Sequence, residues 1–192
     1  MSREIIKERE RAFEYEFCQK VDQEFPQPRG EKLHVNERLQ ALADATGIVD
    51  QSVLLELDEI GINSNFVGAL SLYPLVYVAW ADGRIGKRER AAVLQAVETQ
   101  GHSRGSASYH LLEHWLENPP SQNLFTAWKD YVTAILDTMS SPGAKLTLED
   151  SLMKRVRRVA EASGGILGVH TISDVEEAAM AELERVFDDA PQ

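Results

Sequence analysis

The stretch from Phe66 to Ala81 constrains the fold more than any other part of the sequence, because it is apolar almost all round. A helix that is apolar on every side has to be covered by other elements or by lipid. This stretch is shorter than the roughly 18–20 residues that a membrane-spanning helix needs, and Gly68 and Pro74 interrupt it. We therefore expect a buried central helix that other helices cover, and no insertion into a membrane.

The rest of the chain has the pattern of further helices separated by glycine and proline. Gly47 is placed to end one of them, and Asp50 or Ser52 to begin the next. No segment has the pattern of a strand of any length, so the predicted fold class is all-α, a compact helical bundle. The predicted helices cover 33–45, 50–60, 66–81, 87–100, 105–117, 121–139, 145–163 and 173–187.

The start of the chain differs from the rest in composition. Residues 2–24 predict one long charged helix, on which Phe13, Phe17 and Val21 form a narrow apolar stripe. The proline-rich segment 25–30 ends it, because a residue before proline avoids helical geometry. We therefore expect a helical arm and linker over residues 1–28 and a helical domain over residues 29–192. The arm either packs on the domain or pairs with a partner helix, a second copy of the chain included.

Charge and cysteine content narrow the functional classes. The chain of 192 residues has a net charge of −11, which repels the phosphates of nucleic acids, so we expect no nucleic-acid partner. Cys18 is the single cysteine, which leaves no internal disulfide and is typical of a reducing compartment. The N-terminus is charged and lacks the apolar core of a signal peptide. The expected location is the cytoplasm.

Two segments of the sequence match each other weakly. Residues 78–89 and 159–176 each contain a helix ending in Val-Ala-x-Ala, a glycine turn, an isoleucine and a glutamate in the next helix. In the second segment, Ser173 and Glu176 predict a capping box, in which each side chain bonds the other residue's amide. In the first segment Gly86 takes the cap position, and Glu89 stands at the matching place near the solvent. Two such helical hairpins would bury a shared core between them.

The first of these segments resembles the TerB-like family, which is named for bacterial tellurite-resistance proteins. The resemblance covers about residues 66–187, and its best match is the run Ala81-Asp82-Gly83-x-Ile85-x-x-x-Glu89. Members are compact all-helical proteins in which acidic residues from both halves are thought to converge on a cation. The resemblance implies a stress-response protein that binds a divalent cation through carboxylates: Asp82, Glu89, Glu176 and Glu177.

The second half departs from the family pattern. Ser163 stands where an aspartate is expected, and residues 167–171 lengthen the turn. A hard cation would then need carbonyl or water oxygens to complete its ligands. The first turn also has an explanation without metal, since Gly83 accepts a positive φ, Asp82 caps the turn and Glu89 complements the helix dipole. The alternative function is a metal-free interaction scaffold that uses residues 2–24.

One motif is typical of an enzyme. Residues 110–114 match H-x-x-E-H, the inverted zinc-protease signature, in which His110 and His114 share a helix face and Glu113 acts as base. The predicted helix ends soon afterwards, no accompanying sheet is predicted, and further glutamates at a suitable distance lie only on the last helix, at Glu182 and Glu184. We therefore expect no enzyme and keep a zinc-dependent hydrolase as a remote alternative. Without metal, the leucines between the histidines pack inward.

A short basic cluster spans residues 154–158 on an amphipathic helix. Such a cluster docks an anionic partner in some proteins. The simpler interpretation is a solvent-exposed face whose basic side chains pair with nearby acidic side chains, and we expect this one here.

Overall fold

The computed structural model describes residues 15, 18–20, 34–163 and 172–189. Throughout this described part the regular elements are helices, which confirms the predicted all-α class. The predicted stripe of Phe13, Phe17 and Val21, and the lengthened turn at 167–171, lie outside the described residues. The helices are α2 (Val35–Thr46), α3 (Gln51–Glu59), α4 (Val67–Ala79), α5 (Lys87–Thr99), α6 (Ala107–Glu117), α7 (Gln122–Thr138), α8 (Pro142–Ser163) and α9 (Asp174–Asp188).

Local signals in the sequence set most helix ends. Gly47 ends α2 in the left-handed conformation, with φ at 74°, and Asp50 begins α3 by accepting a hydrogen bond from the Ser52 amide at 2.8 Å. The start of α8 differs from the prediction. The helix begins at Pro142, where we expected a break, because proline lacks the amide hydrogen that a first helical residue leaves unused and has a φ that suits this position.

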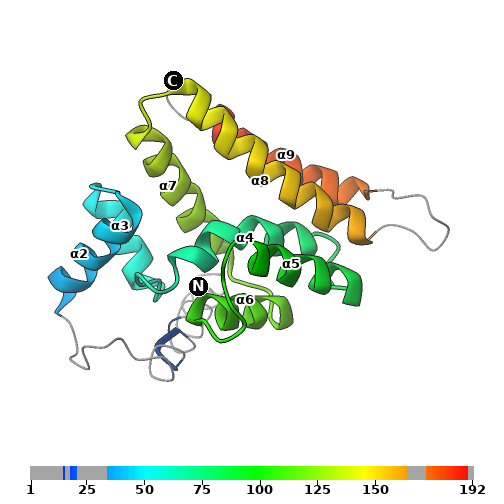
Figure 1. Ribbon diagram of the computed structural model, residues 1–192, viewed down its shortest axis with the longest axis horizontal. Helices are drawn as coiled ribbons and strands as arrows, with labels where there is room; N and C mark the ends of the chain where they lie inside the picture. The colour runs from blue at the N-terminus through cyan, green and yellow to red at the C-terminus, as the bar shows by residue number, and fades with distance from the viewer. Residues whose placement is uncertain (1–14, 16–17, 21–33, 164–171, 190–192) are drawn as a thin grey trace, which may run out of the picture.

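Helix α4 is the predicted central helix. It contacts α2, α5, α6, α7, α8 and α9, and most of its side chains are buried (Figure 1). Pro74 lies inside the helix and does not end it. Aromatic side chains surround α4: the Tyr73 ring meets the Trp115 ring edge-on at 6.0 Å, and Trp80 Nε1 donates to the Trp115 carbonyl at 2.7 Å. None of the helices in the described part of the chain has the length and apolar character needed to cross a membrane.

Two helix pairs flank this centre at opposite ends of the molecule (Figure 1). At one end α2 and α3 are joined by a bidentate ion pair, in which Arg38 contacts Asp58 twice at 2.7 Å. At the other end α8 and α9 lie side by side. Helix α5 packs on α8, and α4 packs on both α8 and α9, so the pairs α4–α5 and α8–α9 share one core. Its buried side chains include Val93, Val97, Val156, Val159, Met180 and Leu183.

Cys18 is the described residue of the N-terminal segment that lies deepest. Its side chain is 1% exposed and packs beside Gly61, in the turn after α3. A Cβ atom added to Gly61 would lie 2.9 Å from the Cys18 Cβ, which is closer than real Cβ atoms approach. The chain at Cys18 therefore packs directly on the helical body.

Candidate functional site

The site predicted from the sequence lies at the starts of α5 and α9, where the expected capping box of Ser173 and Glu176 is present and Glu89 makes the matching bond to the Gly86 amide. Glu89 Oε2 accepts a hydrogen bond from the Gly86 amide at 2.5 Å. Glu176 Oε2 accepts one from the Ser173 amide at 2.8 Å and another from the Ser173 hydroxyl at 2.7 Å. Each glutamate therefore satisfies a backbone amide that the first turn of its helix would leave unpaired.

Both glutamates are buried, Glu89 with 6% and Glu176 with 4% of its surface exposed. The prediction that Glu89 lies near the solvent was wrong. The reason is the cap of α5, because the Glu89 carboxylate folds back toward the Gly86 amide and does not extend into water. Two buried carboxylates are unusual in a helical bundle, since ionised acids are seldom buried unless they are paired.

The charges at this site act on one another across the two helix pairs. Burial raises the pKa of Glu89, and the Gly86 amide acts in the opposite direction. The carboxylates of Asp82 and Glu176 raise the pKa of Glu89 further, while the Arg84 guanidinium lowers it. Acidic side chains from the α4–α5 turn and from the start of α9 are thus each close enough to Glu89 to repel its carboxylate.

Asp82 belongs to the turn between α4 and α5. Its Oδ1 accepts a hydrogen bond from the Arg84 amide at 3.0 Å, and its Oδ2 lies 3.4 Å from Arg84 Nε. Gly83 has a φ of 83°, so the predicted turn with a capping aspartate and a left-handed glycine is confirmed. Glu177 is exposed and does not contribute to the pKa shift of Glu89. Ser163 is the last residue of α8, and the turn after it lies outside the described residues.

The described residues do not form a ready-made metal centre. Within them, no three or more histidine, cysteine, aspartate or glutamate side chains are grouped so that they could hold an ion. Asp82 and Glu176 therefore act electrostatically on Glu89, and the three carboxylates are not arranged as a complete ligand set. A cation at this place would need water or carbonyl oxygens as well, as hard cations commonly accept.

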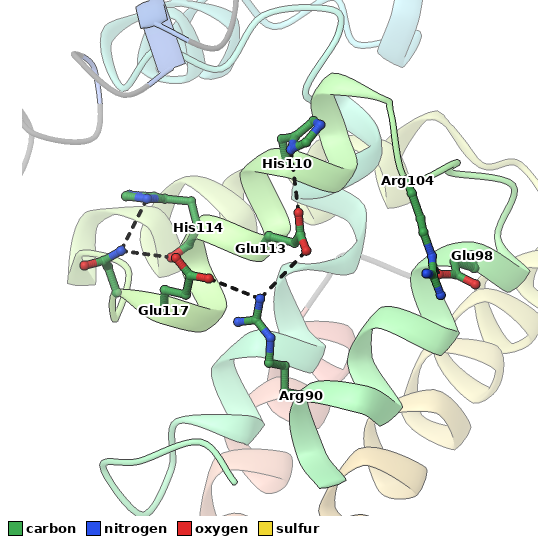
Figure 2. A network of polar contacts seen from close by, with 8 residues as sticks. Arg90, Glu98, Arg104, His110, Glu113, His114 and Glu117 are labelled. Carbon is green, nitrogen blue, oxygen red and sulfur yellow. Dashed lines mark hydrogen bonds and ion pairs between the residues drawn. The ribbon is translucent and has the colours of Figure 1, made fainter. Parts of the chain in front are cut away.

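The H-x-x-E-H motif lies on α6 within a network of ion pairs (Figure 2). Arg90 Nη2 on α5 is 3.7 Å from Glu113 Oε1 and 3.2 Å from Glu117 Oε1. The other oxygen of Glu113 lies 3.6 Å from His110 Nδ1, whereas His114 Nδ1 is 3.3 Å from the Asn118 amide nitrogen. The two rings point toward different partners in Figure 2 and do not converge on one point.

The side chains of α6 are buried as the metal-free interpretation of the H-x-x-E-H motif predicts. Leu111, Leu112 and Trp115 are buried in the core, as expected, while His110 and His114 are only partly covered. Burial lowers the pKa of His114, and the nearby Glu117 acts in the opposite direction. The motif therefore joins α5 to α6 through charged side chains.

An open groove of about 830 Å³ runs beside the acidic site, between α4, the start of α7 and α9. Its floor includes Tyr77 and Phe125, whose rings stack at 4.7 Å, and the Tyr77 hydroxyl donates to Glu182. Burial raises the pKa of Tyr77, and the bond to Glu182 raises it further. Sequence reasoning missed this groove, because its walls come from helices far apart in the chain and its aromatic residues resemble core residues.

Comparisons of the chain with models of known protein families, with curated proteins and with solved structures found no match. The resemblance to the TerB-like family therefore stays a prediction, and so do the roles that it implies for individual residues.

Proposed function

We propose that this protein is a TerB-like, cation-responsive helical protein in which Asp82, Glu89 and Glu176 form the acidic part of the site. The observation that supports this best is the position of Glu89, which is buried and also repelled by Asp82 and Glu176. These three carboxylates come from two separate helix pairs, as the family resemblance implies.

A cation would relieve an electrostatic cost at this place. Buried like charges are unfavourable unless a proton or a metal ion neutralises them. Ca²⁺ and Mg²⁺ prefer carboxylate, carbonyl and water oxygens, and Mg²⁺ commonly keeps several waters when one or two carboxylates hold it. The capping bonds to the Gly86 and Ser173 amides fix the backbone around Glu89 and Glu176, so little chain ordering is needed on binding.

Metal analysis and thermal unfolding test this function. The full chain is purified without chelator, bound metals are quantified by mass spectrometry, and melting is followed in EDTA and with Ca²⁺, Mg²⁺, Mn²⁺ or Zn²⁺ added. Saturation of a native-state site at a hundredfold excess over Kd stabilises by about 2.7 kcal/mol, a shift of several degrees. The shift should vanish in Asp82→Asn and Glu176→Gln.

The matched control is Asp137→Asn, which removes one exposed charge on α7 and should keep the shift. Glu177→Gln decides whether the fourth implied carboxylate contributes. If no cation changes the melting temperature of the wild type, or if Asp82→Asn responds as strongly as the wild type, the proposal fails.

A metal-free interaction scaffold is the second candidate, and one observation favours it. Glu89 and Glu176 already accept hydrogen bonds from the Gly86 and Ser173 amides, and the described residues hold no cluster of metal ligands. This candidate requires a melting temperature that no cation changes, and loss of self-association or partner binding when residues 1–28 are removed. The zinc hydrolase is not carried further, because Glu113 is engaged by Arg90 and the two histidines do not converge.

A further inference from the structure

A second cavity, of about 330 Å³, lies between α4, α7 and α8 and shares no lining residue with the groove beside α9. Its volume falls at the lower end of the range for small-molecule sites. Most of its wall is apolar, with side chains from four helices: Leu72, Val132, Ile135, Leu148, Leu152 and Phe187. Such a wall favours a ligand with a hydrocarbon body.

Two of the residues that line this cavity carry a buried donor with no partner among the described residues. Trp128 is fully buried, and its Nε1 has no hydrogen bond to any residue that the structure describes. The same holds for Arg155 Nε on α8. Indole and guanidinium groups only donate, so only an acceptor can satisfy them. Buried polar atoms usually have a partner, and a pair of such exceptions in one cavity indicates a missing acceptor.

Arg155 also lacks a counter-ion among the described residues, although the chain has 31 acidic and 20 basic side chains. Burial lowers the pKa of Arg155, and no acidic group of the described residues acts against this, whereas Asp58 raises the pKa of Arg38. The neighbouring Lys154 differs, because it contacts Asp150 at 2.6 Å. We expected the basic cluster on α8 to be solvent-exposed and paired with acidic side chains. At Arg155 this expectation is wrong.

Three other polar side chains of the cavity have close neighbours. The Tyr131 hydroxyl lies 3.1 Å from the Ser71 hydroxyl. The His102 ring packs on Gly68 so closely that a Cβ there would be 2.2 Å from the ring. Among the described residues no acidic side chain lines the cavity, so nothing in this part of its wall would repel an anion.

We infer that this cavity binds a small monocarboxylic acid with an apolar body, its carboxylate accepting from Arg155 and Trp128 and its hydrocarbon part lying among Leu72, Ile135 and Leu152. A carboxylate matches the planar donor geometry of a guanidinium and supplies the missing negative charge. A neutral ligand would leave Arg155 without a counter-ion. A nucleotide or polyphosphate would need more cations and more polar wall than the cavity has.

Calorimetric titration of the full chain with octanoate tests this inference, with octanol as a neutral ligand of the same chain length. The titrations are made in EDTA, so that their outcome is independent of the proposed cation site. We expect saturable binding of octanoate with one site per chain, and binding of octanol that is at least tenfold weaker. Loss of one hydrogen bond to a charged group weakens binding about tenfold, so Trp128→Phe should lose that much.

Arg155→Met removes the charge and keeps a long apolar side chain, and it should lose octanoate binding while its melting temperature stays equal or rises. Arg157→Met is the matched control, because it removes an exposed charge from the same helix and should bind octanoate like the wild type. Absence of saturable octanoate binding to the wild type would overturn the inference. Equal affinities of the wild type and Arg155→Met, or of octanoate and octanol, would overturn it too.

Discussion

At the scale of single residues, Glu89 combines a favourable hydrogen bond with an unfavourable charge. Its bond to the Gly86 amide favours the ionised form, whereas burial and the carboxylates of Asp82 and Glu176 favour the protonated form. The second group of effects is larger, because the pKa of Glu89 is raised overall. The protonated form of Glu89, which can still accept the Gly86 hydrogen bond, is therefore more favourable here than it is in water.

Stability should consequently fall with rising pH through Glu89. Its pKa in the folded chain lies above the ordinary value of 4.5, so the folded state binds the proton more tightly than the unfolded state does. The resulting stabilisation is complete below about pH 4.5 and is lost as pH rises through the folded pKa. Glu89→Gln keeps an acceptor without the charge, so in EDTA at pH 7 it should melt a few degrees above the wild type.

Melting curves of both proteins between about pH 4 and pH 8 check this prediction, and the difference should disappear at the acidic end. Asp137→Asn, which removes an exposed charge, should follow the wild type at every pH. A Glu89→Gln variant that is less stable than the wild type at pH 7 would show that the ionised form stabilises the fold.

A substitution at Gly83 tests the turn between α4 and α5, which precedes Glu89. Its φ of 83° is strained for any residue with a Cβ, and a Cβ there would meet nothing within 4 Å. Gly83→Ala should therefore cost about 1–2 kcal/mol through the backbone alone. Gly105 also has open space and does not have a positive φ, so Gly105→Ala should be neutral or slightly stabilising. Urea denaturation of the two variants compares the costs, and equal values would contradict the prediction.

At the scale of helices, the sequence predicts where elements begin and end better than it predicts what they bury. Gly47, Asp50 and the Ser173 box act within a few residues of their own position, so their signals can be read locally. Pro142 shows the limit of this, because proline is typical both of a break and of a first helical position. The burial of Glu89 was missed because charged residues in an amphipathic pattern are assigned to the solvent side.

The cap of α9 can be tested against a serine that does not cap. Ser173 Oγ donates to Glu176 and accepts from its amide, whereas Ser121 at the start of α7 makes no such bond. Ser173→Ala should lose about 1 kcal/mol, which for a chain of this size lowers the melting temperature by about 2–4 °C. Ser121→Ala should change it less. Equal losses in the two variants would mean that the capping box adds nothing beyond the helix start.

At the scale of the whole molecule, the cavities depend on contacts that no local pattern encodes. Arg155 belongs to a basic run that is expected to face water, and it lines the same cavity as Trp128 only when α7 and α8 pack around α4. The groove beside α9 likewise needs Tyr77 and Glu182, which are 105 residues apart. The sequence therefore predicts the helices and the acidic turn. The groove and the cavity depend on the tertiary packing and could not be predicted from the sequence.

Cys18 provides a measurement of how firmly the start of the chain is attached to the helical body. It is the single cysteine and is 1% exposed beside Gly61. Thiol reagents need an accessible thiolate, so a disulfide reagent should label the native chain at least about 100-fold more slowly than the chain in denaturant. The labelling rate then reports how often this segment opens.

Gly61→Ala and Gly47→Ala separate this contact from general destabilisation. Both glycines have a positive φ, 82° and 74°, but only a Cβ at Gly61 would collide with Cys18, so only Gly61→Ala should strongly accelerate labelling. If the wild type is labelled as fast as the denatured chain, the N-terminal segment is released in solution and can bind a partner as a free helix. Slow labelling that Gly61→Ala accelerates would mean that a partner of residues 2–24 has to compete with the Cys18–Gly61 contact, so that removing this contact should strengthen partner binding.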